Sequence, residues 1–353
     1  MMSRLWSEMA RRTEPYVPGE QSGRTGIIKL NTNENPYPPS PKVTEAIQEE
    51  VSRLHLYPSP TADGLRRAIA ETEDLPEDHV FVANGSDEVL AFSFMAFFDP
   101  GRLIRFPDIT YSFYPVYAKL FGIPYEEVPL RDDFTLDIAG FEQSEGGIIL
   151  PNPNAPTGIY EPLDGIRKIL EANPGRVVII DEAYIDFAGP SAAGLISEYD
   201  HLLVTRTTSK SRSLAGLRVG YALGRPKLIE GLVRIKDSFN SYTLDRLAQR
   251  GAEAAFRDAA YFREMTGKVL RTRSRSAEQL GKLGFRILPS SANFLFCRHP
   301  GMAAEQLYLE LKERDILVRH FSNPRISDYL RITVGTDGQM DQLIGVLQEV
   351  LAE

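Results

Sequence analysis

The stretch RTTSKSRSLAGLRVGY, residues 206–221, follows a short apolar run at residues 201–206 that predicts a buried strand. It contains one lysine, Lys210, surrounded by small hydroxylated residues, and Arg218 follows in the same stretch. Most lysines are solvated surface charges, so this lysine alone is weak evidence for a reactive amine. The residues that follow the other predicted strands decide whether Lys210 is a surface charge or a reactive amine.

Two predicted strands are followed by residues that suit a binding site. Residues 80–82 lead into a glycine turn with Ser86 and Asp87, and then into an apolar helix. The free N–H groups at such a helix start attract an anion, although either residue could also serve only as a helix cap. A strand at residues 102–106 is followed by Tyr111, which either fills the core or stacks on a flat ligand.

The apolar run at residues 176–181 is typical of a strand in a parallel sheet that is covered on both faces. It ends at Asp181, and Tyr184 follows within the motif DEAY. In α/β sheets, ligand contacts lie beyond the carboxyl ends of the strands. The strand ends of this chain therefore predict one shared site, with Lys210 as part of it.

The composition indicates a soluble globular enzyme. The chain has 353 residues, of which 42% are hydrophobic and 25% charged. Its net charge of −8 argues against general nucleic-acid binding, and no apolar run is long enough to cross a membrane. The single cysteine, Cys297, suits a reducing compartment, and the five histidines lack metal-ligand spacing. We expect a cytoplasmic protein without a metal site.

The order of the predicted elements suggests three parts. Residues 1–40 are rich in proline and form an N-terminal arm, which we expect to pack with the small domain or a partner subunit. Residues 41–260 alternate strands with helices, as expected for a large α/β domain, whereas residues 261–353 form a smaller α+β domain. Residues 247–280 are largely helical and suggest one long connection between the two domains.

Taken together, these motifs resemble those of the fold-type-I aminotransferases, which depend on pyridoxal phosphate, and most closely the histidinol-phosphate aminotransferase branch. The resemblance runs over nearly the whole chain. It implies a large domain with a mostly parallel seven-stranded sheet covered by helices, a smaller α+β domain and an N-terminal arm. The matching segments are LNTNENPYPPSP (30–41), LYPSP (56–60), ANGSDE (83–88), PNPNAPTG (151–158), DEAY (181–184), TTSKSRSLAGLRVGY (207–221) and YLRITVGT (329–336).

The resemblance implies how the cofactor ring is held. Asp181 would keep the pyridine nitrogen protonated, which the chemistry of pyridoxal phosphate requires. Tyr111 would stack on the ring, and Tyr184 would bind its phenolate oxygen. Many relatives carry a second contact to this oxygen from an asparagine directly before Pro-Thr-Gly. This chain has Ala155 at that position, so the role is carried over to Asn154.

The resemblance also implies how the cofactor is anchored. Lys210 would hold it as a Schiff base and, once released, would move a proton as a neutral amine. We expect its cationic surroundings to lower the pKa of this amine. Ser86, Asp87, Ser209 and Arg218 would grip the phosphate.

Tyr57 matches a family tyrosine that reaches the phosphate from the neighbouring subunit. The resemblance therefore implies a homodimer with two sites at the interface.

The substrate contacts implied by the resemblance are Arg331, which would bind a substrate anion, with Arg319, Tyr16 and Asn33 as further candidates. The activity implied is transfer of the amine of L-histidinol phosphate, a phosphorylated amino alcohol, to the 2-oxo acid 2-oxoglutarate in histidine biosynthesis. An aromatic amino acid aminotransferase or a threonine-phosphate decarboxylase of the same fold is the alternative. A second alternative is a catalytically silent α/β binding protein. A dinucleotide-binding dehydrogenase is disfavoured, because G-x-G-x-x-G is missing after the first strand.

Overall fold

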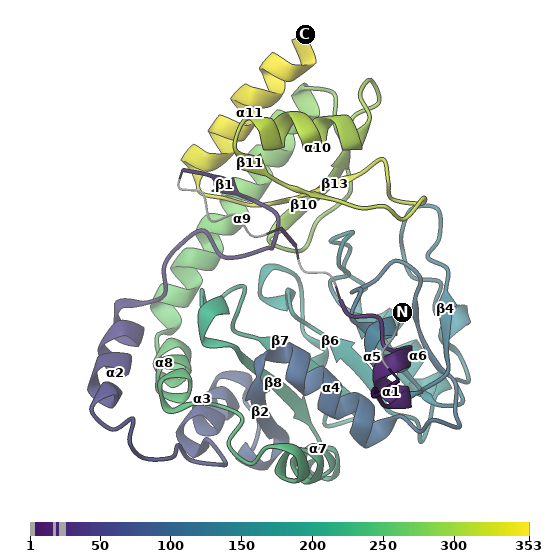
Figure 1. The fold of residues 1–353 in the computed structure, drawn as a ribbon, viewed down its shortest axis with the longest axis vertical. Helices are drawn as coiled ribbons and strands as arrows, with labels where there is room; N and C mark the ends of the chain where they lie inside the picture. The colour runs from purple at the N-terminus through teal and green to yellow at the C-terminus, as the bar shows by residue number, and fades with distance from the viewer. Residues whose placement is uncertain (1–3, 17–18, 21–25, 353) are drawn as a thin grey trace.

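The structure is a computed structural model that describes residues 4–16, 19–20 and 26–352. A seven-stranded sheet forms the larger part of the molecule, and a smaller sheet lies above it in Figure 1. In this described part of the chain, no helix is both long enough and apolar enough to cross a membrane. The same residues contain no group of three or more His, Cys, Asp or Glu side chains that could hold a metal ion.

The seven-stranded sheet is mostly parallel, as the sequence predicts. β8 is antiparallel to both of its neighbours, and all other neighbouring strands run parallel. The predicted α/β class is thus confirmed. In spatial order the strands are β2 (Val80–Asn84), β8 (Val219–Gly224), β7 (Leu202–Thr207), β6 (Val178–Asp181), β5 (Gly147–Pro151), β3 (Ile104–Pro107) and β4 (Tyr125–Val128).

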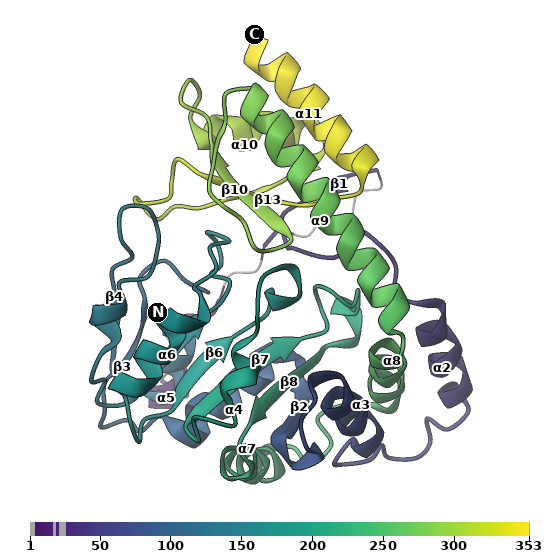
Figure 2. The same cartoon turned by 180° about the vertical axis from the view of Figure 1, so that it is seen from behind.

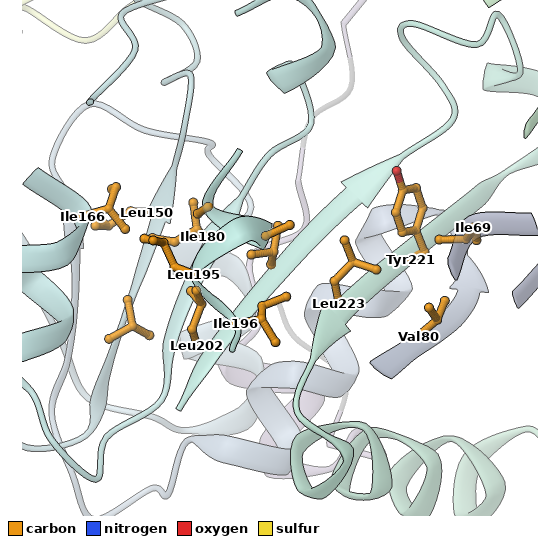
Figure 3. Close-up of a cluster of buried hydrophobic side chains, with 14 of the residues drawn as sticks. Ile69, Val80, Leu150, Ile166, Ile180, Leu195, Ile196, Leu202, Tyr221 and Leu223 are labelled. Atoms are coloured by element: carbon orange, nitrogen blue, oxygen red, sulfur yellow. The ribbon is translucent and has the colours of Figure 1, made fainter. Parts of the chain in front are cut away.

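Both faces of this sheet are buried, because successive side chains of a strand point to opposite faces. Ile180 and Leu202 pack with Ile69 and Ile166 in one core cluster, which Figure 3 shows. Ile179 belongs to the cluster on the other face. The first cluster includes residues of α2 (Pro41–Val51), α3 (Asp63–Glu73), α6 (Leu163–Ala172) and α8 (Arg246–Arg257), and the second includes residues of α4 (Gly85–Phe97), α5 (Tyr114–Phe121) and α7 (Pro226–Phe239).

The smaller sheet has the strand order β12-β13-β10-β9 and is fully antiparallel. Figure 2 shows it from behind, with α9 rising from the large sheet to α11. The domain limits near residues 40 and 260 remain a prediction. The elements of this part are α9 (Ala259–Lys282), β9 (Arg286–Ile287), β10 (Phe294–Arg298), α10 (Ala304–Glu313), β11 (Ile316–Leu317), β12 (Arg319–His320), β13 (Leu330–Thr333) and α11 (Asp337–Ala352).

The N-terminal residues join the two parts of the molecule. The short helix α1 (Glu8–Arg12) lies against α5, where the Arg12 guanidinium donates to the Leu120 carbonyl at 3.0 Å. Further along, β1 (Ile28–Lys29) pairs in parallel with β11 of the small part. The described residues of the arm therefore contact both the large and the small part of the same chain.

Residues 247–280 are largely helical, as predicted, but the connection consists of two helices, α8 and α9, that meet at Asp258. The Asp258 carboxylate accepts a hydrogen bond from the Tyr261 backbone N–H, which caps the start of α9. It also accepts one from the Ser40 hydroxyl at 2.6 Å. A capping side chain that is itself held by another segment favours a break over a continuous helix.

A buried ion cluster lies on the opposite face of the sheet from Asp181. Arg206 and Glu182 are only 6% and 2% exposed, and the Arg206 Nε donates to the Glu182 carboxylate at 3.0 Å. The same guanidinium donates to Glu73 at 2.7 Å and to Ser191 at 2.6 Å. One cation thus compensates two carboxylates that burial would otherwise destabilise.

Arg206→Met should lower the free energy of unfolding by about 3–5 kcal/mol, because it leaves the two carboxylates buried without their cation. Urea unfolding measures this loss. The exposed pair of Arg167 with Glu198 supplies the control, and Arg167→Met should cost far less, because solvent screens the attraction between these two groups. Equal losses in the two variants would contradict the role of the buried cluster.

Candidate active site

Two adjoining cavities lie where the parallel strands of the large sheet end. The inner cavity, of 310 Å³, is lined by residues that follow β2, β5, β6 and β7. The outer cavity, of 680 Å³, extends toward the small sheet. The residues that line both cavities are Thr32, Tyr111, Ala155, Tyr184 and Lys210.

Asp181 is the last residue of β6 and is 4% exposed. The hydroxyl of Tyr114 donates to its carboxylate at 2.9 Å, and the hydroxyl of Thr205 does so at 3.2 Å. Burial nevertheless raises the pKa of Asp181 to about 6. Within the described residues this carboxylate forms no ion pair, so a cationic ring nitrogen beside it would supply the charge that it lacks. The inner cavity therefore fits the expected cofactor at this end.

Lys210 lies between the two cavities, and its Nζ donates to the Thr32 carbonyl at 3.0 Å. Its pKa is lowered to about 8, chiefly by burial and next by the nearby Arg331. Glu34 and Asp87 act in the opposite direction. The lowered pKa agrees with the expectation from the sequence, but burial contributes more than the neighbouring cations.

The start of α4 forms the opposite end of the inner cavity. Gly85 has a φ of +78°, which glycine adopts without strain. A Cβ on Gly220 would lie 2.3 Å from the carbonyl carbon of Gly85 and from the amide nitrogen of Ser86. Only glycine lets β8 come this close to the helix start, where unpaired N–H groups attract an anion. This geometry fits the phosphate of the expected cofactor.

Polar side chains surround this helix start. Arg218 donates to the Asp87 carboxylate at 2.8 Å, and the Tyr111 hydroxyl donates to the same carboxylate at 2.9 Å. The Asp87 side chain thus holds Arg218 and Tyr111 in place, while its backbone belongs to the helix start. Ser86 and Ser209 line the cavity beside them.

Asn154 does not reach either cavity. Its side-chain nitrogen donates to the Ile109 carbonyl and to the Thr157 hydroxyl, both at 3.0 Å. Ala155 lines both cavities instead. The assignment of Asn154 to the cofactor ring is therefore corrected, because this side chain closes its own turn and has no donor left for a ligand. Its side-chain oxygen is buried without a partner among the described residues.

The outer cavity gathers the predicted substrate residues. Arg331, Arg319, Tyr16 and Asn33 all line it. The Arg331 guanidinium donates to the Asn31 carbonyl at 3.0 Å, and burial lowers its pKa.

Two of these residues are also fixed by neighbours. Tyr16 of the arm stacks on Phe113 with 4.4 Å between ring centroids. The Asn33 side chain donates to the Tyr184 hydroxyl at 2.9 Å and accepts from Thr333 at 3.0 Å.

Tyr57 lies outside both cavities of its own chain. It is 78% exposed, and its ring stacks on Tyr242 at 4.8 Å between centroids. Its predicted contribution to the site of a neighbouring subunit stays a prediction.

Tyr114, Thr205 and Thr32 also contact residues of the site, although no motif in the sequence indicates a role for them. Thr205 pairs with Asp181 in the register of β6 and β7, so strand alternation could have indicated that the two side chains share a face. Tyr114 follows Tyr111 closely in the sequence and is the first residue of α5, so its hydrogen bond to Asp181 depends on how this helix packs. Thr32 acts through its backbone carbonyl, for which the sequence holds no signal.

Lys210 should react with acylating reagents at unusually low pH in cofactor-free protein. Only the neutral amine reacts, so its labelling should rise with pH around a midpoint near 8, compared with about 10.4 for an ordinary lysine. Competitive labelling with acetic anhydride, followed by mass spectrometry of the Lys210 peptide, measures this midpoint. A midpoint at the ordinary value would contradict the burial of this amine.

Comparison with known proteins identifies the family of the chain. The model of the family "Aminotransferase class I and II" matches residues 25–347. "Histidinol-phosphate aminotransferase 1" of Oceanobacillus iheyensis is 57% identical over 350 residues, which cover 99% of each chain. "Histidinol-phosphate aminotransferase" of Clostridium acetobutylicum is 54% identical over 352 residues, covering 99% of this chain and all of the relative.

A solved structure shares the fold. The histidinol-phosphate aminotransferase from Sinorhizobium meliloti, solved in complex with pyridoxal-5'-phosphate, superposes with a TM-score of 0.89 at 24% identity, over 99% of this chain and 98% of that chain. The family match spans most of the chain, and the two relatives are more than half identical over nearly their full length. The chain therefore belongs to the family of class I and II aminotransferases.

Proposed function

We propose that the protein is a pyridoxal-phosphate-dependent transaminase that converts L-histidinol phosphate and 2-oxoglutarate to imidazole-acetol phosphate and L-glutamate. The names of relatives that are 57% and 54% identical support this substrate pair. The observation that carries the proposal is the position of Lys210 between two cavities. One cavity holds the Asp181 carboxylate and a helix start suited to phosphate, and the other holds Arg331.

The inner cavity would hold the cofactor. Asp181 would lie beside its ring nitrogen, and the start of α4 with Ser86, Ser209 and Arg218 would bind its phosphate. Tyr111 would cover the ring. When bound, pyridoxal phosphate supplies an electron sink for charge that develops on the substrate carbon.

Tyr184 alone would contact the phenolate oxygen of the cofactor ring. Its hydroxyl would donate to the ring oxygen while it accepts from Asn33. Ala155 offers no side-chain donor at this place.

Lys210 would move the proton. Its Nζ, when neutral, can take a proton from the substrate carbon that carries the amine. The lowered pKa of about 8 means that a larger share of this amine is neutral near neutral pH than for an ordinary lysine. Burial thus prepares the group for its work as a base.

The outer cavity would select the substrate by its negative charge. Arg331 and Arg319 both line it and can bind the phosphate of the donor. The carboxylates of 2-oxoglutarate are also anions, so the same two arginines suit the acceptor. Tyr16 of the arm and Asn33 complete the lining on this side.

A homodimer would complete the site. Several large apolar side chains beside Tyr57 are exposed, which is typical of a surface that another chain covers. The single cysteine suits a reducing cytoplasm, where we place the enzyme. The exposed side chains near Tyr57 and Tyr242 are Val51, Leu54, Leu56 and Phe239.

Histidinol phosphate, added without an acceptor, should convert the yellow cofactor form of the enzyme to its amine form. The second-order rate constant of this conversion should exceed that for phenylalanine by about 100-fold or more. Phenylalanine has no phosphate and so lacks contacts with charged groups that are worth about 3 kcal/mol. Stopped-flow spectra measure both rates. Comparable rates would favour an aromatic aminotransferase, and carbon dioxide release from threonine phosphate would favour the decarboxylase.

Tyr57→Phe should weaken cofactor binding about 10-fold, because it removes one hydrogen bond to a charged phosphate. Lys210→Ala should abolish turnover. If Tyr57 acts across the interface, hybrid dimers of these two chains contain one intact site, and half of the sites should bind the cofactor with normal affinity and turn over. Two differently tagged chains, purified as a hybrid, allow the measurement. A hybrid without any normal site would contradict the exchange of Tyr57 between subunits.

A further inference from the structure

Five consecutive polar residues, Asn31 to Asn35, form a segment that we call the polar strap. Asn31, Thr32 and Asn33 line the outer cavity, Thr32 and Glu34 line the inner one, and several residues of the strap contact groups of the site. The carbonyl of Asn31 accepts from Arg331, and the next carbonyl, of Thr32, accepts from Lys210. Asn33 contacts Tyr184, as described above.

The strap is itself held firmly. The Glu34 carboxylate forms an ion pair with Lys29 and accepts from the Thr32 hydroxyl. The Asn33 carbonyl accepts from the buried Asn293 side chain at 2.9 Å. A segment fixed in this way can serve as a rigid support for the groups that it touches.

Asn35 contacts the backbone at Lys210 and Ser211, and this contact has no role in the proposed chemistry. Its side-chain nitrogen donates to the carbonyl of Lys210 at 3.0 Å and to that of Ser211 at 3.2 Å. Its side-chain oxygen accepts from the Tyr37 backbone N–H at 3.1 Å, which closes a turn within the strap. The Asn35 side chain thus links the strap to the backbone of residues 208–213, which we call the lysine turn.

Side chains and amides of the lysine turn are held by other parts of the chain, since the Ser211 hydroxyl donates to Asp186 and the Arg212 guanidinium donates to the Ala255 carbonyl. The residues from Thr208 to Ser213 belong to neither a helix nor a strand, and Ser213 has a φ of +59°. Among the described residues, no other hydrogen bond reaches the carbonyls of Lys210 and Ser211. The Asn35 amide is therefore the group that fixes these two carbonyls, one of which belongs to Lys210.

We infer that Asn35 is a positioning residue, which fixes the backbone of Lys210 so that its Nζ points into the space shared by the two cavities. The inference rests on the proposed role of Lys210 as the base. The amine sits at the end of a flexible four-carbon side chain, so a small backbone shift changes where it can accept a proton. A misplacement of about 1 Å can lower a rate by about 100-fold.

Two variants isolate the donor function of Asn35. Asn35→Ser and Asn35→Asp both keep an oxygen that can accept from the Tyr37 N–H, so the turn within the strap is retained. The aspartate loses both hydrogen bonds to the lysine turn, and the serine, whose shorter side chain carries a single O–H, keeps at most one of them. The serine variant introduces no charge, whereas the aspartate variant adds a carboxylate opposite two carbonyls.

Asn173 provides a matched control at the end of α6, before β6 begins. Its side-chain nitrogen donates to the carbonyls of Phe141 and Ile169, and its oxygen accepts from the Ser144 N–H. It is therefore an asparagine with the same pattern of two donated bonds and one accepted bond, but it precedes a strand of the sheet, whereas Lys210 follows one. Asn173→Ser should lower stability and leave kcat per folded enzyme within about two-fold, because no reacting group depends on it.

Asn35→Ser should lower kcat by between about 10- and 100-fold with KM within about two-fold of the parent, because substrate binding is retained and the base is misplaced. In cofactor-free protein, the midpoint for acylation of Lys210 should move upward from about 8 toward the ordinary lysine value, since a loosened turn exposes the amine. Asn35→Asp should show the same fall in kcat, and Asn173→Ser should leave the midpoint in place.

The inference is overturned if Asn35→Ser keeps kcat within about two-fold, or if its loss equals that of Asn173→Ser and the acylation midpoint does not move. Failure of the proposed function looks different. A parent protein that takes up no pyridoxal phosphate would refute that function. The acylation midpoint of the cofactor-free chain would still show whether Asn35 positions Lys210.

Discussion

The arrangement of the site depends on a single constraint, the burial of the Asp181 carboxylate at the end of a central strand. A buried carboxylate is costly unless hydrogen bonds and a cation compensate it. The hydroxyls of Tyr114 and Thr205 supply the hydrogen bonds, and neither supplies a charge. The protein therefore carries a local excess of negative charge at the place where a protonated ring nitrogen would lie, and the rest of the inner cavity is built around that place.

Strand geometry separates this site from the machinery that stabilises the sheet. Neighbouring residues of the DEAY motif point to opposite faces, so Asp181 belongs to the cavity and Glu182 to the buried cluster with Arg206. The same alternation places Thr205 on the cavity side and Arg206 behind it. Two adjacent charged residues can thus serve binding and stability independently, because the sheet between them keeps their environments apart.

The sequence predicted well what local pattern and strand order determine. Apolar runs marked most strands of the large sheet, although not the edge strand β4 with its sequence YEEV. The carboxyl ends of these strands located Ser86, Asp181 and Lys210 at one edge. The pattern could not show which way the Asn154 side chain points. In a turn, packing decides whether such a side chain bonds to nearby backbone or faces a ligand. It also could not reveal the contacts of Thr32 and Asn35, because these depend on how the first forty residues return to the lysine turn.

The return of these early residues has a consequence for how the chain acquires its structure. Asn33 is hydrogen-bonded to Thr333, and the two are separated by 300 residues. Contacts of such long range make folding slow, since the ends of the chain must meet before those contacts contribute. During synthesis, the segment that finishes the site is among the first to leave the ribosome, and its partner strand is among the last. The large sheet can form in between, so the nascent chain acquires a folded scaffold long before it acquires a complete place for substrate.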